Sequence, residues 1–337
     1  MTKDLRPTVA IVMGDATGIG PEIVAKLMAH EETHRICIPG IVGDAKVMAA
    51  AIRLTQVGLK MAPAQKWEDL SGQPGQMEIF DLANIDPQQY RVGEVSAHVG
   101  KATMEHLEFA ITAAMAGRTE AVVFAPLNKG ALRLAGSPFG DEHQLYASWT
   151  KPTEHFGEIN YLEPFWTSRS TSHIGFREIC AQLSPERVYK AIMLLGRTMR
   201  RAGLEVPRVG VAALNPHGGE KGLFGPEEET IIRPGMEMAR KEGIDAVGPF
   251  PADTIFVRAR RGEFTGIITM YHDQGQIAIK LLGFDRGVTV CGGQPALLMT
   301  PAHGTAHDIA GKGVADIGAI QSALRLAARM ALVARKK

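Results

Sequence analysis

The chain contains little cysteine and almost no net charge. Its three cysteines, Cys37, Cys180 and Cys291, lie far apart and form no Cys-x-x-Cys pair, which argues against a disulfide framework and against a thiolate zinc site. The 37 basic and 36 acidic residues are mixed along the chain and leave a formal charge of +1. No strong field would therefore attract nucleic acid or an anionic membrane, and we expect a small-molecule partner.

The sequence also lacks long apolar runs. No stretch is long enough to span a bilayer, and the first residues show no apolar segment followed by a small-residue cleavage site. We therefore expect a cytoplasmic protein without a membrane partner. No Gly/Ser linker, low-complexity tract or repeat divides the chain, so any domain boundary is expected in an ordinary loop.

Hydrophobic residues make up 45% of the chain and occur in short β-branched runs that alternate with longer segments of helical periodicity. This alternation predicts an α/β fold with a parallel sheet covered by helices. Strands are expected at residues 9–13, 36–42, 121–124, 209–213 and 266–270. Helices are expected from Pro21 onward, over residues 96–117, after Pro226, and from about residue 317 to the basic C-terminal end.

A glycine-rich segment, Gly14-Asp15-Ala16-Thr17-Gly18-Ile19-Gly20-Pro21-Glu22, follows the first expected strand. Its glycines could let amide N–H groups approach an anion at a helix start. The segment is not a P-loop, because no Gly-Lys-Ser/Thr follows, and Ile23 occupies the third glycine position of the dinucleotide fingerprint. A tight strand-to-helix turn is the favoured interpretation.

Three histidines, His173, His217 and His272, lie in separate segments that we expect at the carboxyl ends of strands, where ligands collect in open α/β sheets. Three neutral imidazoles can bind a divalent ion and leave positions open for substrate oxygens, as in a catalytic site. The alternative is three ordinary polar loop residues, because their spacing does not show that they converge. Lys280 could pair with a substrate carboxylate or, when desolvated, act as a base; a solvated lysine is the alternative.

A second glycine-rich segment, residues 301–316, precedes the last expected helix. Its small residues permit close backbone approach, and His303, Asp308 and Asp316 offer groups for an adenine and its ribose hydroxyls. A glycine-rich turn is the structural alternative.

In chain order, the segments GDATGIGPE, TSH, LNPHGGE, GPFPADTIF, MYHDQG and HGTAHDIAGKGVAD resemble the 4-hydroxythreonine-4-phosphate dehydrogenase (PdxA) family over nearly the whole chain. The resemblance implies a two-domain fold like that of isocitrate and isopropylmalate dehydrogenases. One domain would comprise residues 1–128 and 290–337 with the cofactor loop. The other would comprise residues 129–289, with the metal site and the dimer interface.

The resemblance further implies a homodimer with a shared active site. One subunit would contribute His173, and its mate His217 and His272, to a divalent metal site. Zinc is the first expectation for the ion, with nickel, cobalt, manganese and magnesium as alternatives. NAD or NADP is expected along a loop that includes His303, Gly304, Thr305, Ala306, Asp308 and Asp316. Lys280 and Asp253 are the catalytic candidates, and the expected substrate contacts are Glu142, His143, Gln144, Lys280 and Thr289.

The sequence departs from the family pattern where the substrate would be bound. His143 and Gln144 match the usual Gly-His-Thr-Glu run only after a one-residue shift, and Thr289 replaces an asparagine. Leu298 replaces an arginine, so a bidentate partner for phosphate is lost. Leu298 favours an unphosphorylated acid, such as a carboxylated cis-dihydrodiol of the terephthalate type. The family resemblance favours 4-phosphohydroxy-L-threonine, which we take as the formal expectation.

The expected reaction is NAD(P)-dependent oxidation of the hydroxyl of a small 3-hydroxy acid, with decarboxylation. A bound ion would lower the pKa of the hydroxyl and stabilise the enolate that forms as carbon dioxide leaves. Two functions of other classes stay open at this point. A phosphate acyltransferase can share the two-domain architecture but needs no three-histidine set, and a non-catalytic ligand sensor would bind the cofactor without turnover.

Overall fold

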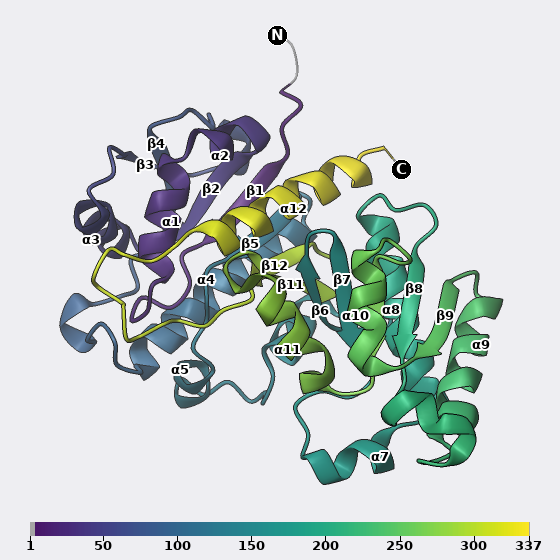
Figure 1. The fold of residues 1–337 in the computed structure, drawn as a ribbon. Helices are drawn as coiled ribbons and strands as arrows, with labels where there is room; N and C mark the ends of the chain where they lie inside the picture. Colours follow the sequence, from purple (N-terminus) through teal and green to yellow (C-terminus); the bar gives the residue numbers. More distant parts are fainter. Residues whose placement is uncertain (1–3, 337) are drawn as a thin grey trace. The chain divides into compact units, whose positions relative to one another are not determined.

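The computed structural model describes residues 4–336, apart from the side chain of residue 284. It shows a mixed α/β fold that divides into two compact units (Figure 1). The first unit lies within residues 1–153 and 285–337, and the second comprises residues 154–284. No helix of the described residues is both long enough and apolar enough to cross a membrane.

The first unit is built on seven strands in the order β3-β4-β2-β1-β5-β12-β11. Neighbours are parallel except for β11 and β12, which are antiparallel. The central strands are buried on both faces, which is why their sequences are continuous apolar runs. The strands are β1 (Thr8–Val12), β2 (Ile38–Gly43), β3 (Lys60–Pro63), β4 (Gln76–Asp81), β5 (Ala121–Phe124), β11 (Val288–Gly292) and β12 (Leu298–Pro301).

The helices of the first unit begin at residues suited to a helix start. Pro21 and Glu22 lie in the first turn of α1, and the side chain of Ser96 caps α4. Figure 1 shows α12, in yellow, beside β5 and β12, which it contacts. The helices are α1 (Gly20–Ala29), α2 (Glu31–Ile36), α3 (Ala45–Thr55), α4 (Ala97–Met115), α5 (Lys129–Leu134), α6 (Glu142–Thr150) and α12 (Gly318–Ala334), with short turns η1 (Trp67–Asp69) and η2 (Pro87–Gln89).

The core of the first unit joins the sheet to α4 and α6. Leu107, Phe124, Tyr146 and Leu298 are buried together in one apolar cluster. The rings of Phe124 and Tyr146 lie 5.4 Å apart, so this cluster fixes the position of α6. The first turn of α6 carries several of the expected substrate contacts.

The second unit has five strands in the order β6-β7-β10-β8-β9. β6 and β7 form an antiparallel hairpin, whereas β7, β10, β8 and β9 run parallel. Its strands are β6 (Gly157–Leu162), β7 (Phe165–Arg169), β8 (Arg208–Ala212), β9 (Asp245–Phe250) and β10 (Gly266–Thr269). Its helices are α7 (Ile179–Gln182), α8 (Pro185–Arg201), α9 (Arg233–Lys241), α10 (Ala252–Arg260) and α11 (His272–Gly283), with shorter helical turns η3 (Phe176–Glu178), η4 (Pro216–Gly222) and η5 (Glu228–Ile232). The turn η6 (Phe284–Arg286) follows α11 and includes the first residues that return to the first unit.

The predicted α/β class is confirmed, and the expected strands correspond to β1, β2, β5, β8 and β10. The expectation of a parallel sheet is incomplete, because β6/β7 and β11/β12 pair antiparallel. The division of the chain also differs from the expected one. Residues 129–153 and 285–289 lie in the first unit, where α5 and α6 pack against α4.

Candidate active site

Four of the expected site residues follow the four parallel strands of the second unit. His173 comes after β7, His272 after β10, His217 after β8 and Asp253 after β9. Parallel strands present their carboxyl ends at one edge of a sheet, where ligands bind in open α/β folds. The fold therefore places these side chains along a single edge.

His173 and His272 lie next to each other at this edge. The backbone amides of Ser170 and Thr171 donate to the carbonyls of Thr269 (2.9 Å) and Met270 (3.0 Å), which aligns the loop after β7 with the end of β10. As a result, the centroids of the two imidazole rings are 5.4 Å apart. Both rings line a pocket of about 290 Å³ together with Phe176, Tyr271 and Asp273.

The His272 ring is oriented by its neighbour in the sequence. Its Nδ1 lies 2.6 Å from Oδ1 of Asp273, so the carboxylate can accept the Nδ1–H proton. That hydrogen bond leaves Nε2 free to bind a metal or a substrate oxygen, as carboxylate partners do for many ligating histidines. The His272 side chain is 37% exposed and lines the pocket.

His217 lies in an unusual loop that a buried carboxylate organises. Glu228 is 2% exposed, and its Oε1 accepts from the amides of Leu214 (2.9 Å) and Asn215 (2.8 Å). Gly219 has a φ of +80°, and a Cβ there would lie 2.5 Å from Oε2 of Glu228. The loop holds His217 exposed at the sheet edge. Glu228 was not predicted as a site residue, because its only signal in the sequence is an acidic residue after Gly225 and Pro226.

The three histidines do not form one compact ligand set within a single chain. Among residues 4–336, the one group of three His, Cys, Asp or Glu residues with ligand atoms within 4.8 Å of one another is Asp141, Glu142 and His143. Asp253 is exposed in the first turn of α10, and Lys280 is exposed on α11, the helix that begins with His272. Lys280 thus shares an element with a candidate metal ligand.

In the first unit, the segment from Gly14 to Glu22 forms the expected strand-to-helix turn and packs against the expected cofactor loop. The amide of Ile19 donates to the carbonyl of Thr305 at 3.0 Å. Oε1 of Glu22, a residue only 2% exposed, accepts from the amide of Gly311 at 2.5 Å. Glu22 was predicted only as part of the strand-to-helix turn, and in the structure it also holds the loop through Gly311.

A polar chain links this turn to the loop. Asp15 is buried and accepts from the Thr17 hydroxyl at 2.6 Å, and the same hydroxyl lies 3.1 Å from Nε2 of His307. Burial raises the pKa of Asp15, while the hydrogen bonds from Thr17 and the charge of His307 act in the opposite direction. His307 was not among the predicted residues, although it lies within the predicted loop.

The expected cofactor residues occupy a mostly irregular segment between β12 and α12. His303, Thr305 and Ala306 are half-buried, and Ala306 has a φ of +44°. Gly304 and Asp308 are exposed. Asp316 accepts from the amide of Gly318 at 2.7 Å and so stabilises the start of α12. This contact gives Asp316 a structural role in addition to the expected binding role.

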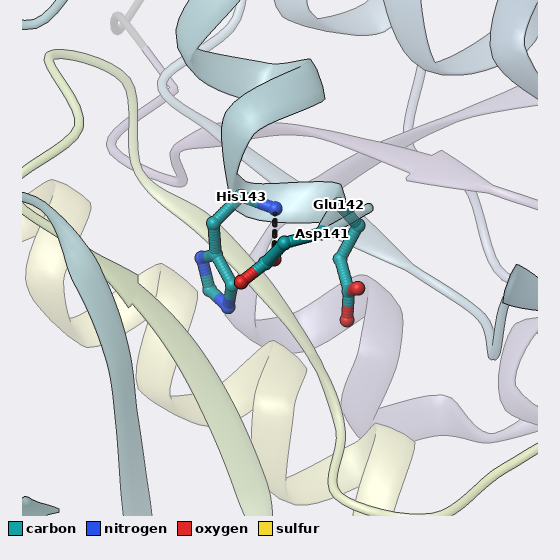
Figure 2. Close-up of side chains that lie close together, drawn as sticks. All are labelled: Asp141, Glu142 and His143. Atoms are coloured by element: carbon teal, nitrogen blue, oxygen red, sulfur yellow. Dashed lines mark hydrogen bonds between the residues drawn. The ribbon is translucent and has the colours of Figure 1, made fainter. Parts of the chain in front are cut away.

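The expected substrate contacts of the first unit lie on α6 and β11. Figure 2 shows Asp141, Glu142 and His143 together at the start of α6. Oε2 of Glu142 forms an ion pair with Nζ of Lys129 at 2.8 Å, His143 is buried and Gln144 is exposed. Thr289 is half-buried in β11.

Leu298 is fully buried in the core cluster. A side chain in this position contributes packing and offers no group to a ligand. Leu298 therefore provides no cation at the position where the family resemblance implies an arginine.

Comparison with known proteins identifies the family. A profile of the family described as "Pyridoxal phosphate biosynthetic protein PdxA" matches residues 35–327. The chain belongs to the PdxA family. A protein of Rhizobium meliloti that is provisionally named 4-hydroxythreonine-4-phosphate dehydrogenase 2 is 43% identical over 331 residues, 98% of this chain and 95% of that protein. The D-threonate 4-phosphate dehydrogenase of Cupriavidus necator is 39% identical and aligns over 98% of both chains.

Solved structures agree with this assignment. The 4-hydroxythreonine-4-phosphate dehydrogenase of Klebsiella pneumoniae has a TM-score of 0.88 at 34% identity, over 98% of this chain and 99% of that one. A terephthalate 1,2-cis-dihydrodiol dehydrogenase of Burkholderia xenovorans LB400 has a TM-score of 0.66 at 28% identity, over 96% and 98% of the two chains. This PdxA-family chain is a dehydrogenase with the two-unit fold of its relatives.

Proposed function

We propose that this PdxA-family dehydrogenase uses a divalent metal ion and NAD or NADP to oxidise the hydroxyl of a small 3-hydroxy acid, with decarboxylation of the product. The observation that carries the proposal is the position of His173, His217 and His272 after three parallel strands, with two of the rings 5.4 Å apart. The names of the relatives support a phosphorylated substrate of the 4-phosphohydroxy-L-threonine or D-threonate 4-phosphate type.

The histidine set fits a divalent ion. His173 and His272 face one pocket, and the Asp273 carboxylate leaves Nε2 of His272 available to a ligand. Imidazole nitrogens suit zinc first, and nickel, cobalt or manganese as alternatives; magnesium prefers oxygen ligands. A bound ion would supply the positive charge that lowers the pKa of the substrate hydroxyl and stabilises the enolate.

We further propose a homodimer in which one subunit contributes His173 and its mate contributes His217 and His272. The exposure of His173 and His217 supports this arrangement. The short distance from His173 to His272 within one chain supports the alternative, a site that uses both from the same subunit. Mixing the inactive variants His173→Ala and His272→Ala distinguishes the two arrangements.

The remaining site residues receive roles that follow from their positions. Lys280 would pair with a substrate carboxylate or transfer a proton, and Asp253, after β9, would be the second group for proton transfer. NAD or NADP would accept the hydride. It would lie along the segment from His303 to Asp316, which the buried carboxylate of Glu22 holds through Gly311.

The substrate class has one competing proposal. Leu298 lies in the core and provides no cation for a phosphate, and a dehydrogenase of a carboxylated dihydrodiol shares the fold. An unphosphorylated acid of that type is therefore the second candidate. The phosphorylated four-carbon acid remains first because both relatives compared by sequence carry a phosphorylated substrate in their names.

A paired substrate panel tests the proposal. The metal-loaded protein is assayed for reduction of NAD and NADP with phosphorylated four-carbon hydroxy acids, and separately with unphosphorylated hydroxy acids and dihydrodiols. We expect turnover with the phosphorylated set. Turnover confined to the unphosphorylated set would establish the second candidate, and no reduction with either set would contradict both.

A further inference from the structure

The first turn of α6 brings three ligand-type side chains together outside the histidine edge. One ligand atom each of Asp141, Glu142 and His143 lies within 4.8 Å of the other two. Figure 2 shows the carboxylate of Asp141 beside the imidazole of His143. The group lies in the first unit, whereas the three histidines of the proposed catalytic site lie in the second.

Two buried polar atoms in the first half of α6 have no hydrogen bond among the described residues. His143 is 6% exposed, and its Nδ1 is buried without a hydrogen bond. The hydroxyl of Tyr146, whose ring centroid is 6.0 Å from that of His143, is also buried and unpaired. An unsatisfied buried polar group is destabilising and is rare in native structures. Their presence beside two carboxylates indicates a ligand that the chain alone does not supply.

The Asp141 carboxylate keeps one oxygen outside the helix cap, whereas the Glu142 carboxylate is paired with a lysine. Oδ1 of Asp141 caps α6 by accepting from the amide of His143 at 2.7 Å, and Oδ2 takes no part in this cap. Oε2 of Glu142 is neutralised by the ammonium of Lys129 at 2.8 Å. The site thus already contains a cation, on a side chain that is 58% exposed and can move away into solvent.

We propose that Asp141, Glu142 and His143 bind a divalent cation of the manganese type, and that this ion displaces Lys129 from Glu142. Two carboxylate oxygens and one imidazole nitrogen form a donor set that borderline divalent ions accept, and three protein ligands leave coordination positions open. A doubly charged ion balances the two negative charges of the carboxylates, whereas the single ammonium of Lys129 balances only one of them.

The ion would also affect substrate binding, a consequence that rests on the proposed function. Glu142 and His143 are proposed substrate contacts, and Leu298 leaves this unit without the family arginine. A divalent ion at α6 would restore a positive charge that can bind phosphate or carboxylate oxygens of the substrate. The cation site itself is tested by binding alone, so its failure is distinguishable from failure of the dehydrogenase proposal.

Manganese binding measured by electron paramagnetic resonance tests the site. The full-length chain carries His173→Ala, His217→Ala and His272→Ala, so that the proposed catalytic ion cannot contribute. We expect this protein to bind one Mn²⁺ per chain. Adding Asp141→Asn, which can still cap the helix, or the isosteric Glu142→Gln should weaken binding about tenfold or more, because a charged ligand is lost.

A substitution of Lys129 should have the opposite effect on the affinity for Mn²⁺. Lys129→Gln removes the competing ammonium and should tighten Mn²⁺ binding, whereas Glu186→Gln, at an exposed ion pair on α8, should leave it unchanged. Circular dichroism checks that each variant is folded. Absence of stoichiometric binding, or binding that Glu142→Gln leaves unchanged, would overturn the proposal.

Discussion

Replacing His272 with alanine should lower metal-dependent reduction of NAD(P) by about 10³-fold or more, because loss of a ligand removes several kcal/mol of charge stabilisation at the reacting oxygen. The fold should persist, since the side chain is 37% exposed and lies outside the core. Steady-state kinetics and the unfolding midpoint are measured on the same preparation. His155→Ala, at an exposed histidine of the same unit, is the matched control and should retain activity.

The variants His173→Ala and His272→Ala also test whether the active site is shared between two subunits. If one subunit supplies His173 and its mate supplies His272, mixing inactive His173→Ala with inactive His272→Ala under conditions of subunit exchange partly restores activity, because hybrid dimers contain one intact site. A site drawn from a single subunit gives no restoration. Retained activity in His272→Ala alone would remove the histidine set from the mechanism.

Phe124→Ala should lower the free energy of unfolding by about 3–5 kcal/mol, because the ring is fully buried and leaves a cavity. Phe124 lies at the end of β5 with its ring 5.4 Å from that of Tyr146 on α6. Phe124→Leu removes less of the side-chain volume and should cost clearly less than Phe124→Ala.

Denaturant unfolding followed by circular dichroism separates these two variants. Because Tyr146 and Glu142 share α6, the alanine variant should also weaken Mn²⁺ binding at α6. Equal, small losses of stability in the two variants would mean that this contact does not fix the helix.

Much of the fold could be predicted from sequence, for reasons that particular segments illustrate. Residues 121–124 are an uninterrupted apolar run, and they form the central strand β5. Ser96 and the periodic apolar residues after it predict α4, which begins at Ala97. The antiparallel hairpin β6/β7 could not be predicted in the same way, because pairing direction depends on which strand lies alongside and not on local periodicity.

The sequence predicted which residues follow the strands at the candidate site, but it did not predict the contacts that hold them. The expected strands β8 and β10 placed His217 and His272 at strand ends, and the structure confirms those positions. Glu228, Glu22 and Lys129 were missed because each acts through a partner distant in sequence: a loop amide, the Gly311 amide and the Glu142 carboxylate. From the sequence, Leu298 was interpreted only as the loss of a positive charge. The structure adds that its side chain packs in the core together with Tyr146 of α6.

The most direct test of the central claim is metal removal and restoration in the unmodified protein. The enzyme is treated with a chelator, dialysed, and assayed for NAD(P)H formation with the phosphorylated hydroxy acids before and after addition of zinc, nickel, cobalt, manganese or magnesium. We predict no turnover in the metal-free protein and recovery with at least one divalent ion. Full turnover in protein shown by elemental analysis to hold no metal would contradict the account.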